Sequence, residues 1–187
     1  MADFLGEVFG VIRKRYKDMG DGTHAEVVAV GGFGSPLPVG GEGDVFTAVP
    51  TITAGAYAAG DAVGELIELA NAVREAGGGG FVVGIVAIDD AGQDAELEFW
   101  LFDDEITDVD DNDAWAPAEA DLEHLVAIVS SNDGSWCAAG TPSALDVDAV
   151  RRFNVVDTSL YLKIVTRGTP TFAATDDLTV RVKIAQD

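Results

Sequence analysis

The segment DVDDNDAWAPAE, residues 108–119, could hold a calcium ion, because its side chains supply the oxygen ligands that calcium prefers. Four of them fall at positions 1, 3, 5 and 12 of the EF-hand loop spacing: Asp108, Asp110, Asn112 and Glu119. EF-hand loops have a glycine at position 6, but this chain has Asp113 there, and Pro117 also interrupts the loop. A solvated acidic loop before a short helix is therefore favoured, with a calcium site as the alternative.

The other residues that could do chemistry are isolated. Gly77–Gly80 lack the Lys and the Ser or Thr that follow the glycines of a phosphate-binding loop, so they predict a turn. The histidines, His24 and His124, are too few for a zinc site, and the single cysteine, Cys137, cannot form an intrachain disulfide. The sequence contains no Gly-x-Ser-x-Gly elbow. We therefore expect a protein that is not an enzyme and that needs no cofactor or metal.

Short strands separated by turns make up most of the chain from residue 45 onwards. In AELEFWLFDD, apolar and polar residues alternate, as is typical of a half-buried strand. Similar strands are predicted at 45–53, 81–88 and 125–131, and residues 159–184 predict a closing hairpin. Residues 64–73 fit a strand or a helix, and PAEADLEHL predicts one short helix. The pattern predicts an all-β fold, a β-sandwich or jelly-roll-like domain, over residues 45–187.

Residues 1–44 differ from the rest and are expected to form an N-terminal arm, a hairpin and a linker. Apolar residues at four-residue spacing over residues 4–16 predict an amphipathic helix, or an arm that becomes ordered only on a partner. RYKDMGDGTHAEVVAV predicts a strand, a tight turn and a second strand. Residues 31–44 are rich in glycine and proline and lack periodicity, which is typical of a linker.

The charge is extreme, with 33 acidic against 11 basic residues and a formal net charge of −22. Such a field repels nucleic acids and anionic membranes, so neither is an expected partner. At about 1 M salt the Debye length is roughly 3 Å, so self-repulsion is largely screened and a halophilic source is expected. The sequence has no signal-peptide pattern and no apolar run near the roughly 20 residues that span a bilayer, so synthesis in the cytoplasm is expected.

The few basic residues lie mainly at the two ends of the chain. Residues 1–17 carry a net charge of +2 and residues 151–187 also carry +2, whereas residues 18–150 contain 27 acids and a single base, Arg74. This distribution has two explanations that the sequence leaves open. The bases contact a partner, or they pair with acids inside the fold.

Two stretches resemble structural proteins of tailed phages. YKDMGDGTHAEVVAV is similar to an N-terminal segment common in such proteins, and DTSLYLKIVTRGTPTFAATDDLTVRVKI resembles the ends of a family of small phage and prophage head proteins. The segments TAGAYAAGDAVGELIELANAVREAGGGG, AELEFWLFDD and DNDAWAPAEADLEHLVAIV follow that family's order, so the likeness covers about residues 15–187. The resemblance implies a β-rich capsid decoration, or cement, protein, and the acidity implies a tailed virus of a haloarchaeon.

On this interpretation the protein coats the capsid exterior of the virion, binds the major capsid protein and forms a homo-oligomer, with a trimer as the first expectation. Contacts are expected from basic and apolar residues at the two ends and in the linker: Phe4, Phe9, Arg13, Lys14, Arg15, Lys17, Phe33, Leu37, Lys163, Arg167, Arg181 and Lys183. The alternatives are a tail, baseplate or receptor-binding turret protein, and a calcium-dependent glycan-binding β-sandwich.

Overall fold

The computed structural model of this chain describes residues 4–7, 13–18, 24–28 and 43–186. The chain divides into two compact units, residues 1–41 and 42–187. In the first unit, three antiparallel strands form a sheet with β2 in the centre. These strands are β1 (Phe4–Glu7), β2 (Arg13–Asp18) and β3 (His24–Val28).

The helix predicted over residues 4–16 is wrong, because β1 and β2 occupy both ends of that range and pair with each other, Phe4 opposite Tyr16. Gly6 and Gly10 each disfavour a helix by roughly 1 kcal/mol, which outweighs the apolar spacing. The two strands predicted for the following segment are confirmed by β2 and β3, and the turn predicted between them lies outside the described residues.

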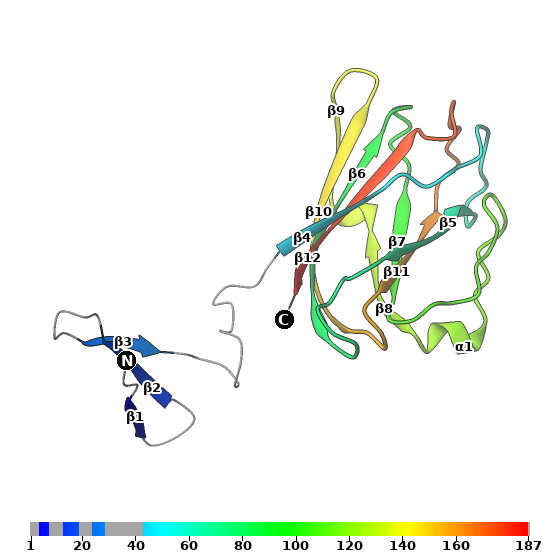
Figure 1. The fold of residues 1–187 in the computed structure, drawn as a ribbon. Helices are drawn as coiled ribbons and strands as arrows, with labels where there is room; N and C mark the ends of the chain where they lie inside the picture. Colours follow the sequence, from blue (N-terminus) through cyan, green and yellow to red (C-terminus); the bar gives the residue numbers. More distant parts are fainter. Residues whose placement is uncertain (1–3, 8–12, 19–23, 29–42, 187) are drawn as a thin grey trace. The chain divides into compact units, whose positions relative to one another are not determined.

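The second unit is a β-sandwich of two antiparallel sheets (Figure 1), so the predicted all-β sandwich is confirmed. One sheet has the order β4-β12-β6-β10-β9 and the other β5-β11-β7-β8. The strands are β4 (Gly43–Ala48), β5 (Ala62–Leu69), β6 (Gly79–Asp89), β7 (Leu97–Phe102), β8 (Leu125–Ser130), β9 (Trp136–Ala138), β10 (Ser143–Asn154), β11 (Leu160–Thr166) and β12 (Leu178–Gln186). The helices in the described residues are α1 (Glu119–Leu122) and the 3₁₀ turn η1 (Ser131–Asp133), and neither is long and apolar enough to cross a membrane.

The core lies between the two sheets because each strand turns alternate residues inward. In β10, Leu145 and Val147 are fully buried, whereas their neighbours Asp146 and Asp148 are exposed. The facing sheet contributes fully buried residues such as Phe99 and Leu162. Burial of this apolar area is the main stabilising term of the domain.

The last two strands do not form the predicted hairpin. β11 is a central strand of the four-stranded sheet, paired with β5 and β7, and β12 is a central strand of the five-stranded sheet, paired with β4 and β6. Residues 167–177 cross between the sheets, and Phe172 anchors the crossing by packing edge to face on Tyr57 at 5.6 Å. Both strands are apolar on their inner face, so each gains more by filling a central position in its own sheet than by pairing with the other.

An acidic segment, residues 103–118, covers part of the outer surface of the four-stranded sheet. The ring of Trp115 packs on Trp100 and Phe102, with centroids 5.8 and 6.4 Å apart, and Phe102 is fully buried although it lies outside the core between the sheets. Backbone hydrogen bonds between residues 112–115 and 60–62 hold the segment in place.

Candidate functional site

The outward side of the five-stranded sheet is exposed over most of its width. Strand registers align its outward residues in rows, such as Thr47, Arg181, Val86 and Asp146 across β4, β12, β6 and β10. We call this surface the β12 face and define it as Val45, Thr47, Phe81, Val83, Val86, Ile88, Ala144, Asp146, Asp148, Val150, Arg152, Thr179, Arg181, Lys183 and Ala185.

Large apolar side chains gather on the β12 face. Among residues 43–186, eight such side chains are exposed, and four of them belong to this face: Val45, Phe81, Val83 and Val150. A fifth, Val49, follows β4 directly. Val150 is the most open of them, at 67% exposure. Several exposed apolar side chains on one face mark an interaction surface more often than apolar residues scattered singly do.

The charge of the β12 face differs in sign from that of its domain. The face holds three bases, Arg152, Arg181 and Lys183, and two acids, Asp146 and Asp148, for a net charge of +1. Residues 42–187 as a whole carry seven bases and 28 acids, a net charge of −21. An acidic partner would therefore be repelled less by this face than by the rest of the domain surface.

The bases of the β12 face are only weakly held by their own domain. Lys183 Nζ lies 2.9 Å from Asp146, whose side chain is 62% exposed, so this ion pair contributes little to stability. Arg181 Nε donates a hydrogen bond of 3.3 Å to the hydroxyl of Thr47, which carries no compensating charge. Both cations therefore remain available for a partner at small energetic cost.

Two of the predicted contact residues lie elsewhere in the domain, on β11 or just after it. Lys163 is fully buried, and its ammonium donates hydrogen bonds to Asp108 and to the carbonyl oxygens of Gly64 and Val109. The expectation that Lys163 contacts a partner is therefore wrong in this fold, because the acidic segment covers it.

Arg167 follows β11 and donates to Glu98 of β7 at 2.7 Å. Its guanidinium lowers the pKa of the Glu98 carboxyl from its usual range. Together with the Lys163–Asp108 pair, this contact supports internal pairing as the role of these two bases of the second unit.

The remaining predicted contact residues fall in the first unit or in the linker. Phe4 lies in β1, and all four bases of the first unit lie in the central strand β2: Arg13, Lys14, Arg15 and Lys17. Phe9, Phe33 and Leu37 lie outside the described residues.

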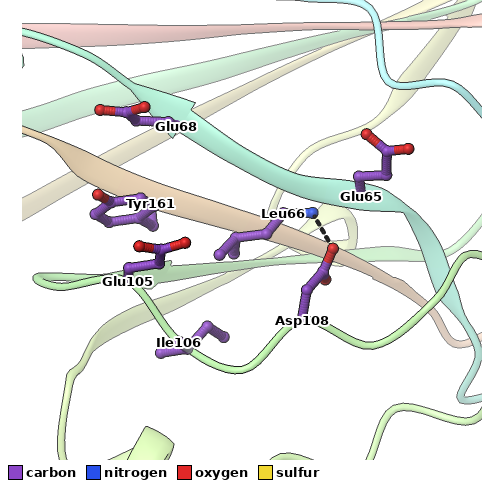
Figure 2. Close-up of a pocket in the computed structure, with 7 residues that line it drawn as sticks. All are labelled: Glu65, Leu66, Glu68, Glu105, Ile106, Asp108 and Tyr161. Carbon is purple, nitrogen blue, oxygen red and sulfur yellow. Dashed lines mark hydrogen bonds between the residues drawn. The ribbon is translucent and has the colours of Figure 1, made fainter.

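A hollow of about 370 Å³ opens on the acidic side of the domain (Figure 2). Glu65 and Glu68 of β5 lie along one side of it, and Glu105 and Asp108 of the acidic segment lie along the other. Burial, together with the negative charge of Glu68 and Glu105, raises the pKa of the Tyr161 hydroxyl. This concentration of carboxylates suits contact with water and cations and disfavours contact with an acidic protein.

The residues of the predicted calcium loop do not converge. Asp108 accepts hydrogen bonds from Lys163 and from the backbone N–H of Leu66, and Glu119 begins α1. In the described part of the chain, no group of three or more His, Cys, Asp or Glu residues could hold a metal ion. The calcium-dependent alternative therefore has no support from this geometry.

His124 and Asp103 form a second charge pair on the acidic side, with Nδ1 and Oδ1 2.9 Å apart. The Asp103 carboxylate raises the pKa of His124 above its ordinary value of about 6.5. The stabilisation from this pair is fully present below the unfolded pKa and is lost as the pH rises through the folded pKa.

We expect a proton NMR titration to place the midpoint of His124 above 6.5 and the Asp103→Asn variant to lower it. An unchanged His124 midpoint in the variant would show that Asp103 is not the cause.

No protein-family model, curated protein or solved structure matches this chain.

Proposed function

We propose that this protein is a virion structural protein that decorates the outside of a tailed-virus head and stabilises it in concentrated salt. The observation that carries the proposal is the β12 face, which combines exposed apolar side chains and a net charge of +1 in a domain of net charge −21. The resemblance to phage head proteins supports the same function.

The physical argument rests on how salt affects each kind of contact. Burial of apolar surface contributes about 25 cal/mol per Å² and does not depend on opposite charges, whereas exposed ion pairs weaken as salt rises. A face built from Val45, Phe81, Val83 and Val150 therefore keeps its affinity in brine. Arg181 and Lys183 offset the repulsion from a shell protein that is itself acidic.

The opposite side of the domain fits exposure to the medium. The carboxylates around the hollow and along residues 103–113 bind water strongly and repel one another less once salt screens them. Such a surface keeps a particle with many copies of this chain soluble. The major capsid protein is the proposed partner of the β12 face.

Mixing the purified protein with undecorated capsids at high salt and pelleting the capsids tests the proposal. We expect the wild type in the pellet and the Val150→Glu variant bound about tenfold more weakly, a loss of ~1.4 kcal/mol. The variant adds a negative charge to an apolar contact. Val156→Glu is the matched control, since Val156 is 61% exposed and lies outside the β12 face.

Three results would contradict parts of this proposal. Wild-type protein that stays in the supernatant would exclude capsid binding. Equal pelleting of the two glutamate variants would exclude the β12 face while leaving capsid binding intact. A particle reconstruction with a dozen or fewer copies would instead indicate a tail or turret protein.

A further inference from the structure

The sandwich has four edge strands, and one of them lacks the usual protection against pairing. Edge strands expose unpaired backbone groups, and proteins commonly guard them with charges, proline or short length. β4 carries Asp44, β5 carries Glu65 and Glu68, and β9 has three residues. β8, with the sequence LVAIVS, has six residues and no charge or proline, in a chain of net charge −22.

One edge of β8 is paired and the other is free among residues 43–186. β8 is the terminal strand of its sheet and pairs with β7, Ile128 opposite Trp100 and Ser130 opposite Glu98. Ile128 is 39% exposed, and Leu122, just before the strand, is 41% exposed. The register shifts between Leu101 and Phe102 of β7, which leaves Ala127–Ser130 as a regular segment.

We propose that the β8 edges of two copies of this chain pair antiparallel about a two-fold axis, forming a dimer with one sheet continuous across both subunits. Neighbouring side chains of a strand point to opposite sides of the sheet. A two-fold axis perpendicular to the sheet therefore pairs a residue of one copy only with a residue of the other copy whose side chain points to the same side of the sheet. An axis through Ile128 places this residue opposite its own copy and Ala127 opposite Val129. Each of these pairs is free of charge, and apolar cross-strand pairs stabilise a sheet.

A second copy is the occupant that the uncharged edge of β8 fits, because pairing of this edge with its own copy places no carboxylate of the strand opposite another. Two chains of net charge −22 repel each other over most of their surfaces. β8 is a six-residue edge strand without Asp or Glu, so two β8 edges can pair without bringing carboxylates of the strands together. A two-fold interface uses the same edge on both subunits and leaves no β8 edge free, so assembly stops at two chains. This dimer replaces the trimer expected from family resemblance and does not use the β12 face.

Salt should strengthen the dimer. Glu123 lies two residues before β8, and the interface brings this carboxylate towards the acidic side of the second copy. Raising the salt concentration shortens the Debye length and weakens that repulsion, while the backbone hydrogen bonds and the apolar pairs remain. Association should therefore tighten from low to high salt.

Sedimentation equilibrium of the full chain over a range of concentrations at high salt tests the dimer. We expect twice the chain mass of 19.5 kDa for the wild type. Ile128→Glu should weaken dimerisation about a hundredfold, because symmetry places two new carboxylates opposite each other. Val156→Glu is the matched control and should remain a dimer, and thermal unfolding should show that both variants are folded.

A cross-link tests the register itself. Ile128→Cys, combined with Cys137→Ser, should form an intermolecular disulfide on oxidation, because residues directly opposite in a sheet have Cα atoms about 4.5–5.5 Å apart. Val156→Cys in the same background should not. A monomeric or trimeric wild type, or a dimer unaffected by Ile128→Glu, would overturn the proposal, and capsid pelleting of these variants reports on the β12 face independently.

Discussion

Replacing Asp108 by alanine is expected to lower the free energy of unfolding by about 3 kcal/mol, because it leaves the buried ammonium of Lys163 without a countercharge. Lys163 Nζ lies 2.5 Å from Asp108 Oδ1, 2.8 Å from the carbonyl oxygen of Gly64 and 2.7 Å from that of Val109. The Lys163 side chain is fully buried, whereas that of Asp108 is 38% exposed. The two carbonyl oxygens stabilise the cation in part but do not neutralise it, so an unpaired buried charge remains.

The converse variant, Lys163→Met, is expected to cost less, about 1–3 kcal/mol. It removes the buried charge and leaves the carbonyl oxygens of Gly64 and Val109 without their donor. The double variant should lose less stability than the sum of the losses of Asp108→Ala and Lys163→Met, because each change removes the same contact.

Denaturant unfolding at one fixed salt and protein concentration measures these differences. Asp110→Ala is the matched control, since Asp110 is exposed in the same segment and should change stability by less than about 0.5 kcal/mol. Equal stability of the Asp108 and Asp110 variants would show that the Lys163 contact is not stabilising. Because the ammonium is buried, added salt should reduce the stability difference between the Asp108 and Asp110 variants only slightly. The contribution of an exposed ion pair would fall far more.

Lys163 also shows why the sequence could predict the strand but not the role of its base. Leu160, Leu162 and Ile164 alternate with Tyr161 and Lys163, so the pattern places Lys163 on the outer side of β11, as the structure does. The acidic segment that covers that side is close in space but distant in sequence, at residues 103–118. No local pattern predicts such coverage, so the sequence left open whether Lys163 contacts a partner or pairs with an acid inside the fold.

The sequence also did not predict which strands belong to which sheet, for the same reason. Alternation predicted β7, and an apolar run after a glycine turn predicted most of β6, because both signals lie within one strand. Which strand pairs with which depends on contacts between distant segments, and adjacency in sequence wrongly favoured a hairpin for β11 and β12.

The β12 face was predictable only in part. Arg181 and Lys183 were predicted to be contact residues because they are bases in an acidic chain, and both lie on this face. Phe81 and Val83 belong to a continuous apolar run that is typical of a strand buried on both sides, so their exposure could not be inferred. In β10, the alternation of buried and exposed residues makes Val150 an apolar residue at an outward position, and this signal could have identified it.

Gly64→Ala is expected to destabilise the domain by about 2–5 kcal/mol, through two separate effects at one position. Gly64 has a φ of 71°, and a side chain in this left-handed region costs roughly 1–2 kcal/mol. A Cβ atom at this position would lie 2.5 Å from the Cβ atom of buried Pro50, so the packing must shift at a further cost of about 1–3 kcal/mol. The backbone N–H of Gly64 also donates to Asp111, and its carbonyl oxygen accepts from Lys163, so this shift would disturb both contacts.

Gly77→Ala separates the two effects, because Gly77 has a similar φ of 75° but no atom within 4 Å of the point that a Cβ atom would occupy. It should cost only the backbone term, roughly 1–2 kcal/mol. Denaturant unfolding of the two variants under identical conditions, with unchanged m-values, gives the difference as the cost of the Pro50 contact. Equal destabilisation by the two substitutions would mean that the segment around Pro50 moves aside freely, and that β5 is held at this point by its hydrogen bonds to Asp111 and Lys163 rather than by close packing.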